Sequence, residues 1–365
     1  MNIKRFVKDW VPYRVIEKRY DSSTFVDDYL KWKSLENNNI DYSNKFQTIV
    51  SVQGFGFSGS GAVVDLLREY EPCQILGGVD DESGNVVNDE KVGEFDFLRH
   101  SGGFYDIERH LGYNNVFIND GVINRFIKMV FFSGLYRNYS ESHAIFFDFL
   151  NSITDLELLN LNGRYYNPNL YLHDKKSSIF FLKDQTIDEY RKKCRNCLNA
   201  LFGLFHNESK SILVADQMCC DLEFDIERDK SYFDRLKTII IYRDPRDVYA
   251  YAVSKNVEWI AHNNVDSFIT WYKNMLRKFS LTSTDALLVR FEDLLTDYEA
   301  NVTRIEDYIG LSCYDHINKF RNLNPDISKK NIGIWRNSKL NCNDFEKIKS
   351  NLSTMCFDVD NGKSE

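Results

Sequence analysis

Two kinds of hydrophobic pattern alternate along most of the chain. Short apolar runs rich in Ile, Val and Leu are typical of buried strands, whereas apolar residues that recur every three or four positions are typical of helices packed on a core. The expected strands are residues 48–53, 74–76, 211–215, 237–242 and 286–290. The expected helices include residues 245–254, 265–280 and 298–309. This alternation predicts an α/β fold with a central parallel sheet flanked by helices.

The aromatic residues are concentrated outside this strand pattern, in residues 100–210. Apolar spacing there is mostly helical, so we expect a helical, aromatic-rich insertion into one α/β domain. The expected divisions are a helical N-terminal extension (1–45), the α/β domain with its insertion (46–340), and a C-terminal helix and tail (341–365). Residues 79–90 are polar and rich in Gly, Asp and Asn, which predicts a loop.

Composition and charge narrow the class of protein. The chain has 365 residues, of which 43% are apolar and 27% charged, which is ordinary for a folded protein. Its formal net charge of −8 argues against a general nucleic-acid binder. No apolar run is long enough to span a membrane, and the N-terminus lacks the apolar core of a secretory signal. We therefore expect a cytoplasmic protein, and the abundance of Asn, Lys and Ile favours a bacterial source.

The first twenty residues contain six basic and two acidic side chains. Ile3, Phe6, Val7 and Trp10 fall at helical spacing, and Pro12 limits the length of the helix. Two interpretations stay open: a helix that packs on the domain with a solvated basic face, or peripheral contact with an anionic membrane surface.

Cysteine usage gives little indication of a metal or redox site. Of the 8 cysteines, Cys194 and Cys197 form a CxxC pair inside a helical pattern, and Cys219 and Cys220 are adjacent. A zinc site would need two such pairs at a recognisable spacing with supporting ligands. We expect a structural role for these thiols and no bound metal.

A glycine-rich turn lies between the first strand and the next helical pattern, at residues 54–61 (GFGFSGSG). Glycines allow a sharp turn, and the helix that follows directs free N–H groups toward an anion, so we expect a phosphate cradle. A triphosphate-binding loop would continue with Lys and Ser or Thr, but Ser60 and Gly61 follow here. The letters also fit GxGxxG, with Asp80 or Asp81 as a late ribose ligand, so a nicotinamide-dependent oxidoreductase stays an alternative.

A second anion site is expected at Arg243-Asp244-Pro245-Arg246-Asp247, which directly follows the strand 237–242. Open α/β sheets bind ligands at the carboxyl ends of their strands, where an arginine can grip a phosphate. The alternative is a surface cluster of salt bridges.

Together these segments resemble the sulfotransferases that use 3′-phosphoadenosine 5′-phosphosulfate. Residues 57–61 stand where that family has its 5′-phosphosulfate loop, and Arg243 to Asp247 match its Arg-(Asn/Asp)-Pro-x-Asp motif for the 3′-phosphate. Residues 289–294 (VRFEDL) and 331–337 (NIGIWRN) are similar to two later motifs. The resemblance implies a P-loop-like fold and these cofactor-binding residues: Phe57, Ser58, Gly59, Ser60, Gly61, Ala62, Arg243, Tyr251, Ser254, Asn331, Ile332 and Gly333.

The chain departs from the family at two of these positions. Phe57 stands where the family has Lys or Arg, so backbone N–H groups, the hydroxyls of Ser58 and Ser60, or another cation such as Lys91 or Arg99 must replace that charge. The second 3′-phosphate ligand of the family is a serine eight residues after the arginine; that position is Tyr251 here, and Ser254 lies one turn further on.

The implied reaction is in-line transfer of a sulfuryl group to a hydroxyl, with adenosine 3′,5′-bisphosphate as leaving group. It requires positioning, charge stabilisation and a base, but no metal. Glu94, in a segment similar to the Lys-Glu of sugar sulfotransferases, is the first candidate for the base, and Asp216 and His100 are the others. The expected acceptor is a carbohydrate or glycolipid. Phe57 also leaves open an inactive protein that only binds the bisphosphate.

Overall fold

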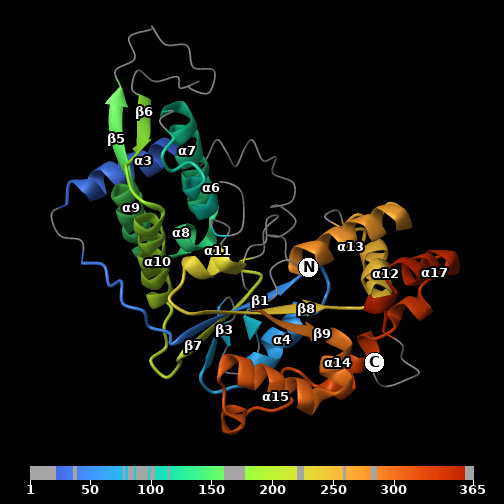
Figure 1. The fold of residues 1–365 in the computed structure, drawn as a ribbon. Helices are drawn as coiled ribbons and strands as arrows, with labels where there is room; N and C mark the ends of the chain where they lie inside the picture. The colour runs from blue at the N-terminus through green and yellow to red at the C-terminus, as the bar shows by residue number, and fades with distance from the viewer. Residues whose placement is uncertain are drawn as a thin grey trace, which may run out of the picture. The chain divides into compact units, whose positions relative to one another are not determined.

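The computed structural model describes residues 22–35, 39–76, 79–80, 86–87, 98, 103–113, 116–159, 177–219, 226–257, 260–280 and 286–357 (Figure 1). The chain forms two compact units. Unit 1 contains Met1–Ser43 and Glu90–Leu204, and unit 2 contains Asn44–Asp89 and Phe205–Glu365. The basic segment 1–21 lies outside the described residues, so both interpretations of it stay predictions, as do the expected domain boundaries.

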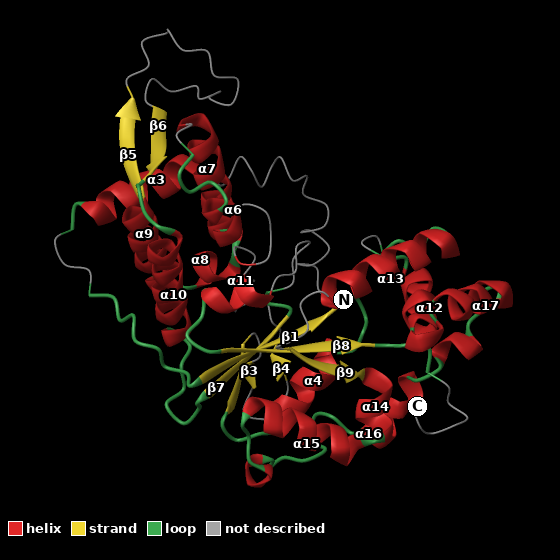
Figure 2. Cartoon of the chain, in the orientation of Figure 1, coloured by secondary structure: helices red, strands yellow, loops and turns green. Residues whose placement is uncertain are grey.

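Unit 2 is built on a parallel sheet of five strands in the order β2-β7-β1-β8-β9. Figure 2 shows the strands in yellow and the helices in red. The strands are β1 (Thr48–Gly54), β2 (Cys73–Leu76), β7 (Ile212–Asp216), β8 (Leu236–Tyr242) and β9 (Ala286–Arg290). The predicted α/β fold with a central parallel sheet is confirmed, and each strand begins and ends within one residue of its expected bounds. β1 lies at the centre and all seven of its residues are buried, as expected for a run of β-branched side chains between two strands.

Helices cover both faces of this sheet. Successive residues of a strand point to opposite faces, so an apolar strand presents apolar side chains on both sides and each side has to be covered. On β8, Ile239 and Ile241 belong to one core cluster, and Ile240 belongs to another. The first cluster includes side chains of α4 (Ser60–Leu67), α14 (Phe291–Thr296) and α15 (Tyr298–Ile309). The second includes side chains of α12 (Pro245–Lys255), α13 (Val265–Ser280) and α17 (Cys342–Asn351). Shorter elements of unit 2 are α11 (Ile226–Ser231), α16 (Pro325–Ser328), η1 (Cys313–Asp315), η2 (Lys329–Asn331), η3 (Ile334–Asn337) and η4 (Ser353–Met355).

Residues 79–90 differ from the expectation of a loop. Within this range the structure describes two short strands, β3 (Val79–Asp80) and β4 (Val86–Val87), which pair antiparallel. The valines explain the pairing, because β-branched side chains favour extended backbone even in a polar segment.

Unit 1 is mainly helical, with one antiparallel hairpin. Its elements are α3 (Ser22–Lys33), α6 (Phe104–Glu108), α7 (Val116–Phe132), α8 (Gly134–Asn138), α9 (Glu141–Ile153), β5 (Thr154–Leu159), β6 (Ser177–Leu182) and α10 (Ile187–Gly203). On α10, Cys194 and Cys197 are 0% and 2% exposed, and burial raises the pKa of both thiols. Buried neutral thiols of this kind act as small apolar core residues.

Among the helices that the structure describes, none combines the length and the apolar character needed to cross a membrane.

Candidate active site

The glycine-rich turn joins β1 to α4 through three residues in the left-handed region. Gly56, Phe57 and Gly59 have φ angles of 56°, 53° and 100°. α4 begins at Ser60, so the N–H groups of Ser60 and Gly61 precede the first i→i−4 bond of the helix, whereas the N–H of Ala62 donates to the carbonyl of Gly59 at 2.9 Å. A turn of this shape directs successive N–H groups and the positive end of the helix dipole toward one point, which is the geometry that an anion requires.

Two glycines of the turn are required by close packing. A Cβ atom at Gly54 would lie 2.2 Å from the Oγ atom of Ser58, whose residue is only 2% exposed. A Cβ atom at Gly59 would lie 2.4 Å from the ring of Phe291. In contrast, a Cβ atom at Gly61 would meet nothing within 4 Å. Ser58, inside the turn, and Phe291, outside it, therefore leave no room for a side chain at Gly54 and Gly59.

Arg243 follows β8, the strand beside β1, and connects three segments that are distant in the sequence. Its guanidinium donates to the carbonyl of Phe57 at 3.3 Å and to the carbonyl of Asn331. The guanidinium carbon lies 4.9 Å from the ring centroid of Phe291. The side chain is 8% exposed, yet Nε has no hydrogen-bond partner among the residues that the structure describes. A buried cationic N–H without a partner is costly, which suits a site completed by an anionic ligand.

Asp247 holds the late loop in place beside Arg243. Its carboxylate is fully buried and accepts the N–H groups of Gly333 at 2.8 Å and Trp335 at 3.0 Å. One of its oxygens lies 3.5 Å from the Arg243 guanidinium. Burial raises the pKa of Asp247, while the charge of Arg243 and the two backbone N–H groups oppose that rise. Gly333 is in the left-handed region at φ 73°, and Ile332 beside it is half-buried.

Arg246 has a different role from Arg243. It donates to both carboxylate oxygens of Asp244, with the shortest contact at 2.6 Å, and to the carbonyl of Phe357 at 2.9 Å. The N–H of Phe357 returns to Asp244 at 2.8 Å. As whole residues, Arg243, Asp244, Arg246 and Asp247 are between 0% and 6% exposed. The alternative of a salt-bridge cluster is therefore wrong about the surface location, but the pairs Arg243–Asp247 and Arg246–Asp244 are present. The hydrogen bonds of Arg246 are structural.

Tyr251 and Ser254 lie on α12 with different surroundings. The ring of Tyr251 lies 4.3 Å from that of Phe57, centroid to centroid. The hydroxyl of Ser254 donates to the carbonyl of Tyr251 at 2.9 Å, on the exposed side of the helix. The structure therefore places Tyr251 beside the glycine-rich turn and turns Ser254 back toward its own helix. The rings of Phe57 and Tyr251 are in contact and tilted by 40° to each other.

Glu292, from the segment 289–294, lies beneath the Arg243 turn. It is fully buried and accepts the N–H of Asp244 at 2.9 Å, while the hydroxyl of Tyr272 donates to the carbonyl of Arg243 at 2.6 Å. Burial raises the pKa of Glu292 to about 7; the N–H of Asp244 and the charge of Arg243 lower it, and the charge of Asp244 raises it.

The pKa of Glu292 predicts a pH-dependent stability. In the folded chain the carboxyl of Glu292 keeps its proton up to about pH 7, whereas in the unfolded chain it releases that proton near pH 4.5. The contribution of Glu292 to the free energy of unfolding is therefore complete below pH 4.5 and is lost as the pH rises through about 7. In the wild type, the free energy of unfolding should fall by roughly 2–3 kcal/mol between pH 5 and pH 8 for this reason. Glu292→Gln should not show this decrease, because a glutamine side chain does not titrate. Denaturant unfolding across this range measures the difference. The exposed Glu346→Gln variant is the control, and parallel curves for wild type and Glu292→Gln would contradict the assignment.

Of the three candidate bases, Asp216 is the one that the structure describes. It ends β7, where it pairs in register with Val52 of β1, and its side chain is exposed at the carboxyl edge of the sheet. Glu94 and His100 lie outside the described residues, as do Lys91 and Arg99, the candidates for the missing cation. Within the described ranges no group of three or more His, Cys, Asp or Glu side chains could hold a metal ion.

Two residues of the site were not predicted from the sequence. Phe291 forms the floor between the glycine-rich turn and Arg243, and its place directly after β9 was the available signal. Gln217 follows Asp216 at the end of β7 and hydrogen-bonds the glycine-rich turn. A long amide at the end of a strand next to a glycine-rich turn is a weak signal, because its meaning depends on the register of the strands.

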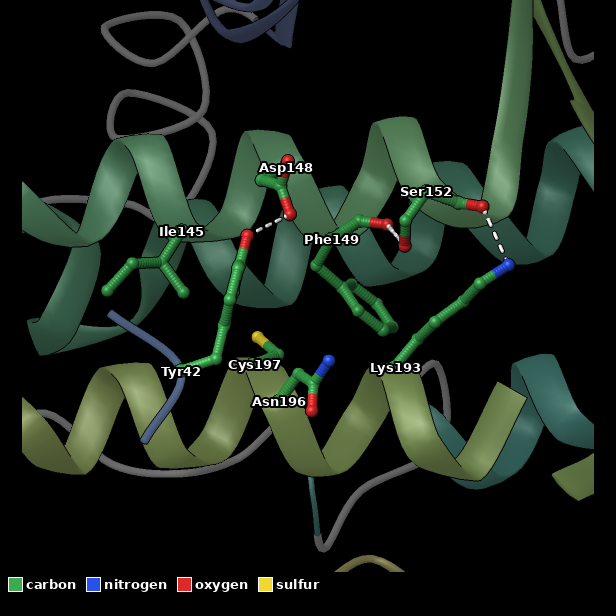
Figure 3. Close-up of a pocket in the computed structure, with 8 residues that line it drawn as sticks. All are labelled: Tyr42, Ile145, Asp148, Phe149, Ser152, Lys193, Asn196 and Cys197. Atoms are coloured by element: carbon green, nitrogen blue, oxygen red, sulfur yellow. Dashed lines mark hydrogen bonds between the residues drawn. The ribbon is translucent and has the colours of Figure 1, made fainter. Parts of the chain in front are cut away.

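Unit 1 contains a small cavity of about 100 Å³ between α9 and α10 (Figure 3). Tyr42 donates to the carboxylate of Asp148, and Lys193 donates to the carbonyl of Ser152 at 2.9 Å and to Gln185 at 2.8 Å. Because these groups satisfy one another and the volume is below that of ordinary ligand sites, this cavity is a packing feature.

Comparison with known proteins gives distant structural neighbours. The sulfotransferase domain of the Synechococcus PCC 7002 olefin synthase is 14% identical to this chain. The match covers 89% of this chain and 100% of that domain, with a TM-score of 0.39. A sulfotransferase from Mycobacterium avium is 10% identical, with 92% and 80% coverage and a TM-score of 0.36. The sulfotransferase domain from the curacin biosynthetic pathway is 11% identical, with 85% and 99% coverage and a TM-score of 0.36. No protein-family model matches the sequence, and no curated protein does.

Proposed function

We propose that the protein is a sulfotransferase that moves a sulfuryl group from 3′-phosphoadenosine 5′-phosphosulfate to a hydroxyl group. One observation carries the proposal: the buried guanidinium of Arg243 joins the glycine-rich turn, the turn after β8 and the loop at 331–333. Three motifs, of which the outer two are 274 residues apart at Phe57 and Asn331, thus meet at the carboxyl edge of two neighbouring strands, where ligands of open α/β sheets bind.

The chemistry of the donor groups fits a nucleotide with two separate anionic ends. The N–H groups at the start of α4 would hold the 5′-phosphosulfate. Arg243, whose Nε has no hydrogen-bond partner among the described residues, would hold the 3′-phosphate. When bound, the nucleotide supplies the sulfuryl group. The chain itself provides N–H groups that can stabilise negative charge developing on the 5′-phosphate side as the acceptor oxygen approaches.

The structure fits one of the two alternatives less well and leaves the other to experiment. A nicotinamide-dependent oxidoreductase would use the glycine-rich turn but gives the buried Arg243 no role. An inactive bisphosphate-binding protein is favoured by Phe57, whose uncharged ring lies against Tyr251. A measured transfer of sulfuryl groups separates this second alternative from the proposal. A carbohydrate or glycolipid acceptor, a cytoplasmic location and a bacterial source stay predictions, as do the absence of nucleic-acid partners and peripheral contact with a membrane.

We expect the protein to bind adenosine 3′,5′-bisphosphate more tightly than 5′-AMP. Arg243→Ala should remove most of that preference, about 1.5–3 kcal/mol for a charge-assisted contact. Thermal shift and calorimetric titration with both nucleotides measure it, with NAD and ATP as further ligands.

Arg321→Ala is the matched control, because Arg321 is an exposed arginine of the same unit. It should bind both nucleotides like the wild type. Equal affinity of the wild type for adenosine 3′,5′-bisphosphate and 5′-AMP would overturn the assignment of Arg243, and a melting-point increase with NAD alone would favour the oxidoreductase.

A further inference from the structure

Gln217 lies where β7 stops short of the glycine-rich turn. β7 pairs with β1 up to Val52, opposite Asp216, so it ends two residues before Gly54. The backbone N–H of Gln217 donates to the carbonyl of Val52 at 2.8 Å. Gln217 then enters the left-handed region, with φ 56°, which costs energy for a residue with a long side chain and directs that side chain back along β1.

The side-chain amide of Gln217 takes the place of the missing strand. With the amide assigned the orientation in which its oxygen faces a donor and its nitrogen faces an acceptor, Oε1 accepts the N–H of Gly54 at 3.0 Å and Nε2 donates to the carbonyl of Gly54 at 3.1 Å. This is the paired exchange of hydrogen bonds that a neighbouring antiparallel residue would make. On the other side, β8 pairs Gly54 with Ile241. The last residue before the turn is therefore held from both sides.

The same Oε1 atom also accepts the hydroxyl of Ser60 at 3.1 Å. A serine hydroxyl has one hydrogen, so Ser60 offers only lone pairs to a ligand above the first turn of α4. Among the residues described at this end of the site, the donors that remain include the backbone N–H groups of Ser60 and Gly61 at the start of α4.

We infer that Gln217 is a positioning residue for the 5′-phosphosulfate end of the site. It fixes the N–H cradle in the orientation that binds the anion, and it directs the Ser60 proton away from that anion. This inference rests on the proposed function, because it assigns Gln217 a role in the binding of the same nucleotide.

The test uses Gln217→Met, which keeps the length of the side chain but removes all three hydrogen bonds. We expect affinity for adenosine 3′,5′-bisphosphate and for 5′-AMP to fall by the same factor, about tenfold or more, because Gln217 acts at the 5′ end that the two nucleotides share. Gln47→Met is the matched control, since Gln47 is exposed immediately before β1, at the amino end of the sheet. It should bind both nucleotides like the wild type.

A second measurement separates positioning from general stability. Ser60→Ala should have the smaller effect on nucleotide affinity in the wild type, because the Ser60 proton goes to Gln217 there. In Gln217→Met the freed hydroxyl can donate to the anion, so Ser60→Ala should there cost about fivefold or more. A loss of stability alone would give the same effect of Ser60→Ala in both backgrounds.

The outcomes distinguish this inference from the proposed function. If the wild type does not bind the bisphosphate, the proposed function fails first. If the wild type binds and Gln217→Met binds equally well, or if Ser60→Ala has the same effect in both backgrounds, the positioning role is overturned and the proposed function stands.

Discussion

Glu94→Gln is expected to slow sulfuryl transfer by roughly 10²–10⁴-fold, the usual contribution of a general base. Glutamine keeps the size and hydrogen-bonding capacity of the side chain but cannot take the proton of the acceptor hydroxyl. Affinity for adenosine 3′,5′-bisphosphate should barely change, because the base acts on the acceptor. Single-turnover transfer at saturating nucleotide measures the rate of this step without product release.

Asp216→Asn and His100→Gln belong in the same experiment. Asp216 has the clearest structural claim among the described residues, because it ends the strand beside β1 at the carboxyl edge of the sheet. One variant of the three should show the large loss, and the other two then serve as matched controls. A rate for Glu94→Gln within about threefold of the wild type, far less than a base contributes, would exclude it and transfer the role to whichever variant is slow.

Gly59→Ala is expected to reduce nucleotide affinity by about 100-fold, from two physical causes. A side chain at φ 100° is strained by about 1–2 kcal/mol, and the new Cβ atom would press on Phe291, a form of overpacking that costs about 1–3 kcal/mol. Phe291 also lies under the Arg243 guanidinium. The substitution should therefore disturb both ends of the proposed nucleotide site.

Gly310→Ala is the matched control. Gly310 directly follows α15 with φ 88°, and a Cβ atom there would meet nothing within 4 Å. This variant has the backbone strain without the contact on Phe291, so it should bind the nucleotide like the wild type. Circular dichroism verifies that both variants fold. A folded Gly59→Ala protein that binds like Gly310→Ala would place the nucleotide elsewhere.

The sheet could be predicted well because its signal is local. Ile239, Ile240 and Ile241 favour a strand whatever surrounds them, and α13 and α15 begin and end where their apolar spacing predicts. The hairpin β5–β6 could not be predicted in a helical insertion, because each strand needs a partner about twenty residues away.

The site could be predicted only in part. The glycines and Arg243 follow a recognisable spacing, but the contacts between their segments depend on where strands stop in space. Ser58 was expected to face the ligand, yet its residue is buried and its Oγ atom lies against Gly54. Phe57 is recognisable in the sequence as a missing cation, but the contact of its ring with Tyr251 depends on the fold and has no local signal.

The carboxylate of Asp247 accepts two N–H groups of the loop at 333–335, so contacts within the chain already hold this loop. A loop that is already ordered loses little conformational entropy when a ligand arrives, so binding energy is not consumed in closing it. The same preorganisation slows the dissociation of a bound ligand, because the ligand has to break its contacts with an ordered loop. The bisphosphate product would then have a long residence time, and its departure would limit turnover more than the transfer step does.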